Sequence, residues 1–588
     1  MNINCDFRSS NGKENMFLPG LVPIVLGVTG HRDIPKEDVA KLSLATLEIL
    51  RNITELTPNS PHILISCLAE GADRIAAHCA LDFGWALGVV LPSSIESYEL
   101  DFNSTQSKDE FRTLIKAASW VETAPSEHLQ KPDYLAAGIR MMQQSQLLIA
   151  YWNGMSTGLQ GGTSDLVEKF KSEIPVSGDR LLGNSPPDAR PVVHVMTRRG
   201  GENTELMLDT VGKIEWLPPQ PCGMNGTGEL ERWREVLRRI DLFNSDATSF
   251  CQKHSHLVHL SRGYLELETD LERRNEFQGE EVSACMFALA DAMSAQAQNE
   301  RTHVFYKVSG LALAAVVLEQ TYSGLFSSPF VLCCSVLCGI FATLIFRDGT
   351  RRRIEARYLD YRSLAEACRV QYYWMKCGIR ASVENNFLME QRDELEWIRR
   401  AITTNELSVN VALFKLPNEM NCFDLVKRSW IEEQCHYFVG CSERNGGNKA
   451  DLNYRKSQAW STRASTVFMV GVFVVVALVI SRSYLIGHWP DDGALIAQFA
   501  GVTYGVLFAL AGLMKVYQEV SAFSEHSRSY RRSGLLMRRA SQRLAFAINS
   551  SDIEYAQRVI YAAGCEALDE NGDWLLLHRD RPVQVPLG

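Results

Sequence analysis

Four short apolar runs in the first 200 residues are typical of buried β-strands. They occupy residues 22–28, 63–65, 147–151 and 191–197, and they are rich in Val, Ile and Leu. The second and third runs each lead into a glycine-containing turn and then into a helical pattern, which begins near Gly71 and at Thr163. Strands that alternate with helices predict an α/β domain built on a parallel sheet.

A different pattern begins after residue 281, where four long apolar segments come in two close pairs. They cover residues 304–322, 329–346, 464–481 and 494–514. The second, third and fourth are long enough to cross a bilayer core of about 30 Å. The first has an uncharged centre of only about 16 Å as a helix, so Lys307 and Glu319 must snorkel for it to span. A buried hairpin in a soluble core is the alternative, but two such pairs favour four membrane spans.

The flanking charge predicts the orientation of both hairpins. Arginines and a lysine follow the second and fourth spans, whereas the loops 320–328 and 482–492 carry a single Arg between them. By the positive-inside rule both termini lie in the cytoplasm. A long charged helix is expected after each hairpin, over residues 352–374 and 517–548, so the plan is duplicated. The aromatic residues of the first of these stems are expected to pack between stems; they are Tyr358, Tyr361, Tyr372, Tyr373 and Trp374.

Composition and local sequence argue against four features: a nucleic-acid partner, a disulfide scaffold, a signal peptide and a metal site. The net charge of -9 excludes a nucleic-acid partner held by bulk electrostatics. The fifteen cysteines are scattered, which favours a reducing cytosol over a disulfide scaffold. The first fifteen residues lack the apolar core of a signal peptide and are expected to form a loose tail. No metal site is predicted, because the spacing of the one His/Cys cluster fits no closed zinc site; its members are Cys251, His254, His256 and His259.

Three loops at the ends of the predicted strands carry the candidate chemistry. They are the Thr29 to Arg32 turn, the Ser66 to Arg74 turn and the Gly-rich stretch that ends at Asp165. Helix starts beside glycine turns direct backbone N–H groups into one crevice of an open α/β sheet, where anions bind. Arg32 and His31 add charge-assisted contacts to phosphate. The loops therefore predict a site for a phosphate-bearing ligand.

These loops resemble those of the SLOG family, Rossmann-like domains that sense or process nucleotide-derived ligands. The motifs are GVTGHRD, SCLAEGADR, LPSSIESYELDF, LLIAYWNG and GGTSD, within residues 21–199. The resemblance implies a nucleotide-derived ligand of the cyclic-nucleotide or ADP-ribose type. The predicted ligand-binding residues, with His31 and Ser66 added from the loops, are Gly27, Thr29, Gly30, His31, Arg32, Ser66, Glu70, Gly71, Asp73, Trp152, Gly161, Gly162 and Thr163.

The LOG enzymes of the same superfamily cleave nucleoside monophosphates and carry a PGGxGTxxE motif. When Gly162-Thr163 is aligned with the GT of that motif, Gly158 replaces the proline, and Leu159 and Gln160 replace the paired glycines. Leu166 stands where the catalytic Glu is expected. We therefore predict binding without a catalytic residue. A hydrolase that uses Glu70 and Asp73 as acid and base is the alternative.

The C-terminal half resembles the SLATT family, two-span effector modules of bacterial conflict systems. The resemblance covers residues 283–588 and rests on RYLDYRSLAEACRVQYYW, SWIEEQCHYF and EALDENGDWLLLHRDRPV. It implies a homo-oligomeric, multi-pass protein of the bacterial inner membrane that forms a pore or disrupts lipid when its messenger binds. The alternative to an effector or a hydrolase is a membrane scaffold with a vestigial site.

The predicted fold class is therefore an α/β Rossmann-like domain followed by an all-α region with four spans. The predicted organisation is a tail (1–20), a ligand-binding domain (21–200), a helical connector (201–282) and two-span modules over 283–425 and 426–588.

Overall fold

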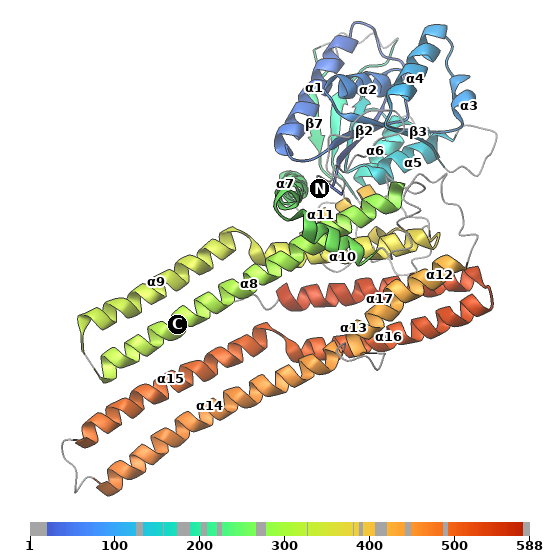
Figure 1. Cartoon of the computed structure of the whole chain (residues 1–588). Helices are drawn as coiled ribbons and strands as arrows, with labels where there is room; N and C mark the ends of the chain where they lie inside the picture. Colours follow the sequence, from blue (N-terminus) through green and yellow to red (C-terminus); the bar gives the residue numbers. More distant parts are fainter. Residues whose placement is uncertain are drawn as a thin grey trace. The chain divides into compact units, whose positions relative to one another are not determined.

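The computed structural model describes residues 20–124, 133–156, 158–172, 189–200, 209–219, 226–265, 278–325, 327–379, 381–386, 392–405, 420–440, 448–485 and 492–579 (Figure 1). The chain divides into two compact units. The first contains residues 1–262, 269–289 and 380–416, and the second contains residues 263–268, 290–379 and 417–588. The polypeptide therefore passes between the units several times.

The first unit is built on a seven-stranded sheet with the order β4-β3-β2-β1-β5-β6-β7. All neighbouring strands are parallel except β6 and β7. The strands are β1 (Ile24–Gly30), β2 (His62–Ser66), β3 (Ala86–Leu91), β4 (Trp120–Thr123), β5 (Leu147–Trp152), β6 (Val192–Met196) and β7 (Ile214–Leu217). This arrangement confirms the predicted α/β, Rossmann-like class, and it adds three strands that the apolar runs did not reveal: β3, β4 and β7.

Helices cover both faces of the sheet, and two glycines of β1 show which helices they are. Gly27 lies against the Met141 sulfur of α5 (Tyr134–Gln144), whereas Gly30 lies against Ala72 at the start of α2 (Ala72–Asp82). Residues three apart on a strand point to opposite faces, so α5 and α2 lie on opposite sides. The remaining helices of the α/β domain are α1 (Val39–Leu56), α3 (Ile95–Glu99), α4 (Thr105–Ala117) and α6 (Thr163–Lys171).

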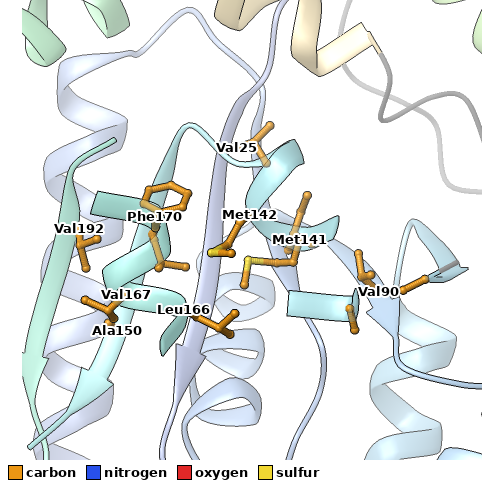
Figure 2. Packing of buried hydrophobic residues seen from close by; sticks show 13 residues of the cluster. Val25, Val90, Met141, Met142, Ala150, Leu166, Val167, Phe170 and Val192 are labelled. Carbon is orange, nitrogen blue, oxygen red and sulfur yellow. The ribbon is translucent and has the colours of Figure 1, made fainter. Parts of the chain in front are cut away.

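The core on the α5 side is formed by apolar side chains from the strands and from two helices (Figure 2). Met141 and Phe170 have no exposed surface, and Leu166 is only 5% exposed. The parallel strands are buried on both faces, which is why their sequences are continuous apolar runs and do not alternate.

The first unit also contains two segments from later in the chain. One is α7 (Gly226–Gly263), which is kinked at His254. The other is α11 (Arg392–Asn405), in which every side chain from 395 to 404 is buried. Trp397 of α11 lies 6.0 Å from Phe243 of α7, measured between ring centroids. A segment that lies between the two apolar hairpins in sequence is therefore part of the core of the first unit.

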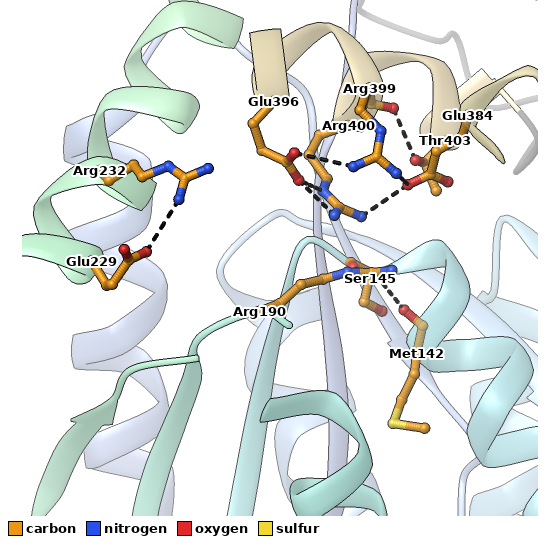
Figure 3. A network of polar contacts seen from close by, with 10 residues as sticks. All are labelled: Met142, Ser145, Arg190, Glu229, Arg232, Glu384, Glu396, Arg399, Arg400 and Thr403. Carbon is orange, nitrogen blue, oxygen red and sulfur yellow. Dashed lines mark hydrogen bonds and ion pairs between the residues drawn. The ribbon is translucent and has the colours of Figure 1, made fainter. Parts of the chain in front are cut away.

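Four buried charges accompany α11. Arg400 bonds to Glu396 at 2.6 Å and to Glu384 at 3.1 Å, while Arg399 lies 3.3 Å from Glu396 and 3.7 Å from Glu384 (Figure 3). The guanidinium of Arg400 also lies 5.5 Å from the ring centre of Trp233 in α7. The two cations and two anions give the cluster a net charge of zero, and charges are tolerated in a core when they are paired in this way.

The second unit contains two helical hairpins. One is formed by α8 (Gln278–Gly324), which belongs to this unit from residue 290 onward, with α9 (Pro329–Arg351), and the other by α14 (Lys449–Leu485) with α15 (Asp492–Val520). Among the described residues, four helical segments are long and apolar enough to cross a membrane: Val282–Gly324, Pro329–Lys376, Lys449–Ser481 and Ala497–Asn549. They contain the first three predicted spans and all but three residues of the fourth, and they confirm the helical part of the predicted fold class. Small residues bring the hairpins together, because a Cβ on Gly505 would lie 2.5 Å from the Gln320 amide oxygen.

Each hairpin is followed by a sharp break at a non-glycine residue and then by a long helix. Arg353 (φ 53°) precedes α10 (Ile354–Lys376), and Ala522 (φ 45°) precedes α16 (Phe523–Asn549). The predicted duplication of plan thus extends to the backbone conformation at the end of each hairpin. Further helices pack around these stems: α12 (Asn421–Val426), a π-helix (Lys427–Glu432), α13 (Glu433–Val439) and α17 (Ile553–Arg579).

The aromatic residues of α10 pack inside this bundle, as predicted. Trp374 is fully buried, and its ring lies 5.0 Å from that of Tyr561 in α17. Gly564 of α17 is required at this contact, because a Cβ there would lie 2.3 Å from the indole nitrogen. Tyr373 stacks on Trp430 at 5.0 Å. These side chains hold the stems together and leave no surface for a ligand.

Candidate functional site

The sheet order reverses between β1 and β5, because β1 continues into β2 on one side while β5 continues into β6 on the other. Helices therefore leave these two strands toward opposite faces. A crevice forms outside the carboxyl ends of strands at such a switch point, and ligands of open α/β sheets bind there. In this chain, the carboxyl ends of β1 and β5 are followed by His31 and Asn153.

His31 is the central side chain of this edge and is only 4% exposed. The backbone nitrogen of Asn153 lies 3.3 Å from its Nε2, and Nε of Arg199 lies 3.4 Å from its Nδ1. A neutral imidazole accepts at one nitrogen only, so the tautomer decides which donor it receives. His31 thereby links the ends of β1, β5 and β6, and Arg199, which follows β6, is itself exposed.

Arg32 extends from the end of β1 toward residues from later segments. Its guanidinium carbon lies 4.8 Å from the centre of the Tyr134 ring, and the Tyr134 hydroxyl donates to Asp101. Arg32 is exposed, and Tyr134 is 38% exposed. Arg32 and Arg199 are thus two exposed cations at the edge where the sequence predicts a phosphate.

The turn between β2 and α2 is pressed against the end of β1. The Ala72 N–H donates to the His31 carbonyl at 3.1 Å, so the first amide of α2 has a protein acceptor. Gly71 has a φ of +83°, and a Cβ at this position would lie 2.3 Å from the Arg32 carbonyl oxygen. Leu68 in the same turn also has a positive φ of 54° although it carries a bulky side chain. Backbone strain of this kind occurs preferentially at functional sites.

Asp73 is buried beneath this turn. Its carboxylate accepts from the Ala69 N–H at 3.3 Å and is 5% exposed. Burial raises the pKa of Asp73 to about 7, although backbone N–H groups and the cations Arg32 and Arg74 act in the opposite direction. Ser66 is also buried and accepts from the Leu68 N–H at 3.0 Å, which fixes the turn.

Glu70 belongs to a polar network with α4. The Ser107 hydroxyl donates to Glu70, and Nη1 of Arg74 donates to the Ser107 hydroxyl at 2.8 Å and to Glu110 at 3.0 Å. Arg74 is 3% exposed, and its guanidinium lies 4.4 Å from the centre of the Phe102 ring. The contacts of Glu70 therefore hold α4 against the β2–α2 turn.

The third predicted loop follows β5 and leads into α6. Gly161 has a φ of +74°, and its N–H donates to Asp165 at 2.8 Å. Partial burial raises the pKa of Asp165, but Lys169 and this N–H lower it by more, so the pKa lies below its usual value. Gly162 precedes α6 without a side-chain cap, and Thr163 is the first helical residue. No side chain caps the start of α6, so an anion can bind to the backbone N–H groups there.

The structure brings most predicted residues to this edge but places three elsewhere or in other roles. Gly27 lies in the middle of β1, where a Cβ would lie 2.4 Å from the Met141 sulfur, and Thr29 is buried within the same strand. The indole N–H of Trp152 donates to the Met155 carbonyl at 2.8 Å and so shapes the loop after β5. Leu166 belongs to the core of Figure 2, so the position of the LOG-type glutamate is occupied by packing.

Sequence reasoning missed several residues of the site. Asp101 and Asn153 lie within the motifs LPSSIESYELDF and LLIAYWNG but were not predicted to bind the ligand, and Tyr134 lies outside all the motifs. Arg198, shortly after β6, does not face solvent. It is 8% exposed and bonds to Asp38 at 2.6 Å, which ties β6 to the start of α1. The described residues include no group of three His, Cys, Asp or Glu side chains able to hold a metal.

We expect Asp73→Asn to stabilise the protein at pH 8 but not at pH 4. Folding raises the pKa of Asp73 from 3.8 to about 7, so the contribution of this carboxyl to the free energy of unfolding is largest below pH 4. That contribution is lost as the pH rises to about 7. The loss amounts to a few kcal/mol, since one pKa unit corresponds to about 1.4 kcal/mol. Thermal unfolding of the full chain in detergent at both pH values measures it. Exposed Asp82→Asn in the same helix is the control, and an equal shift for both variants would contradict the prediction.

No known family model matches this chain, and no curated protein matches it.

Proposed function

We propose that this protein is a membrane effector controlled by a phosphate-bearing, nucleotide-derived ligand. The observation that carries the proposal is the combination, in one chain, of a Rossmann-like switch point, with Arg32 and Arg199 exposed at the carboxyl edge of its sheet, and four helices able to cross a membrane. The resemblances to the SLOG and SLATT families support it and suggest a role in bacterial antiviral defence.

The ligand binds at the carboxyl edge of the sheet in this proposal. Arg32 and Arg199 contact its phosphate groups, and the start of α6 supplies backbone N–H groups. Tyr134 offers a partly exposed aromatic ring beside Arg32. Phosphates bound by main-chain amides and arginines are common to cyclic nucleotides and ADP-ribose-type molecules, which are the two classes we propose.

Ligand binding shifts the protein toward its active state by the difference between the binding free energies of the ligand for the active and the inactive state, and by no more than that. Loops that close on a phosphate supply such a preference. The spans of the oligomerised copies then form a pore or disrupt the lipid. By the positive-inside rule, the crevice and both termini face the cytoplasm of the inner membrane.

A dye-leakage assay on liposomes that contain the full chain tests the proposal. We expect leakage with one member of a panel of cyclic nucleotides and ADP-ribose derivatives, and none without it. In the Arg32→Glu/Arg199→Glu variant, the ligand concentration needed is expected to rise by about a hundredfold or more, because two charge-assisted contacts become repulsive, each worth at least about 1.5 kcal/mol. Arg51→Glu, on the exposed side of α1, is the matched control. A wild-type response in the double variant, or leakage that ignores the whole panel, would overturn the proposal.

A nucleotide hydrolase is the second candidate, because a buried carboxyl with a pKa of about 7 beside the crevice is a usable general acid. Asp73 is that group, and Glu70 lies three residues before it. Mass spectrometry of nucleotides incubated with the full chain separates the two functions. Product formation that is lost in Asp73→Asn favours the hydrolase, and intact nucleotides favour the sensor.

A further inference from the structure

One face of α16 in the second unit is strongly basic. It carries six arginines that are all exposed: Arg528, Arg531, Arg532, Arg538, Arg539 and Arg543. At 100° per residue these positions fall within about 140° of the helix circumference. We call this face the arginine stripe. Two large apolar side chains lie within it, Leu535 (49% exposed) and Phe546 (68% exposed).

The opposite face of α16 is already used by the bundle. Met537, Leu544 and Ala547 are buried there, and α16 packs on α13, α14 and α17. Within the described residues, the stripe has one ion pair, between Arg531 and Asp451 at 3.3 Å. Arg528, Arg538, Arg539 and Arg543 have no ion-pair partner in that part of the chain. The stripe is therefore an exposed, largely unneutralised surface with apolar side chains inside it.

The neighbouring helix α17 carries a face of opposite sign. Glu566, Asp569 and Asp573 follow one another at spacings of three and four residues, so they lie on one side of the helix, and both aspartates are exposed. Partial burial raises the pKa of Asp569, and the two neighbouring carboxylates raise it further, while Arg532 acts in the opposite direction. We call these residues the acidic patch. Their mutual repulsion is relieved only if additional cations approach.

We propose that the arginine stripe of one copy docks on the acidic patch of a second copy of this chain. Each copy offers both surfaces on adjacent helices, so two copies can exchange the contact in a two-fold dimer, or the contact can repeat from copy to copy in a ring. The proposal rests on the oligomerisation assumed in the proposed function and specifies its interface.

The bilayer surface is the other candidate for the stripe, but the packing within the second unit opposes it. Lys456 of α14 lies 5.9 Å from the Phe523 ring centre, and Ser527 donates to the Ala450 carbonyl at 2.8 Å. From Phe523 to Ser527, α16 therefore runs toward the start of α14 and away from the apolar span that begins at residue 464. Fourteen helical residues separate positions 450 and 464, about 21 Å. Lipid charges at that distance are screened, since the Debye length is about 8 Å at physiological ionic strength.

A charge exchange tests the interface with the full chain in uncharged detergent and without ligand. Arg538→Glu/Arg539→Glu and Asp569→Arg/Asp573→Arg are each expected to raise the dissociation constant of the oligomer by about tenfold or more, because like charges then face each other. A mixture of the two variants is expected to associate again, because each changed surface meets its complement. The same holds for a single chain that carries all four changes. Light scattering coupled to size-exclusion chromatography reports the mass.

Two outcomes would overturn the proposal. One is an unchanged oligomer in either double variant. The other is dissociation in both variants that neither the mixture nor the fourfold variant reverses. Lys36→Glu/Lys41→Glu, in the first unit, controls for a general effect of charge and is expected to leave the mass unchanged. Because no ligand is used, failure here leaves the liposome result intact, and failure of the liposome assay leaves the mass measurement interpretable.

Discussion

Arg400→Met is expected to destabilise α11 by about 3–5 kcal/mol, the typical cost of breaking a buried ion pair. The guanidinium of Arg400 is 1% exposed and neutralises Glu396 and Glu384, as Figure 3 shows. Without it, two carboxylates share one remaining cation, Arg399, inside the core. Hydrogen exchange of the α11 amides in the full-length protein, in detergent, measures the local free energy of opening.

The double variant Arg400→Met/Glu396→Met is the control that separates charge from packing. It leaves Arg399 opposite Glu384, 3.7 Å away, so the cluster is neutral again. We expect it to regain most of the lost protection, since buried ion pairs are often replaced by apolar side chains at little cost. A double variant as unprotected as the single one would show that Arg400 acts through its packing on Trp233 and not through its charge.

In the chain, α11 lies between two segments of the second unit. Before it, α10 belongs to the second unit, and after it the chain returns to the second unit at residue 417. Only six residues separate the end of α10 at Lys376 from Val383 of the short 3-10 helix that supplies Glu384.

The fold class was predictable because both of its signals are strong in the sequence. Buried parallel strands leave continuous apolar runs, as in β1 and β5, and membrane spans leave long uncharged ones. The strands β4 and β7 are four residues long and contain Glu122 and Glu215, so neither gives an apolar run. β3 is apolar, but its Gly88, over which the Trp120 ring lies, weakens the strand pattern.

The role of α11 could not be predicted for a different reason. Its sequence, RDELEWIRRAITTN, has the charge content of a surface helix. Burial becomes tolerable only because Glu384, from a preceding short helix, completes a neutral set of charges. Such compensation depends on tertiary contacts and leaves no periodic signal.

Part of the candidate site was also predictable from the sequence, and part of it was not. The turns at Gly30, Gly71 and Gly161 were predictable, because glycine marks both tight approach and positive φ. Tyr134 and Asp101 join Arg32 only through the packing of the segments that follow β3 and β4. No local pattern connects residues so far apart in the chain.

Gly71→Ala and Gly84→Ala are expected to differ widely in cost although both glycines have a similar φ, +83° and +90°. A positive φ costs a residue with a Cβ about 1–2 kcal/mol or more, and Gly71, with a ψ of −120°, lies in the mirror-β region that only Gly populates readily. At Gly84 no atom lies within 4 Å of the added Cβ, so the backbone conformation is the only source of the cost of Gly84→Ala. At Gly71 the Cβ would lie 2.3 Å from the Arg32 oxygen and 2.6 Å from the His31 oxygen.

Those two atoms belong to the backbone at the end of β1 and cannot rotate away as a side chain can. Overpacking adds about 1–3 kcal/mol, so Gly71→Ala should cost about 2–5 kcal/mol in total. Relief of the overlap moves α2 away from β1 and breaks the bond from the Ala72 N–H to the His31 carbonyl. We therefore expect Gly71→Ala to lower the thermal midpoint more than Gly84→Ala and to abolish the ligand response of liposomes, whereas Gly84→Ala keeps it. Equal midpoints with both responses intact would mean that the contact between α2 and β1 does not shape the crevice.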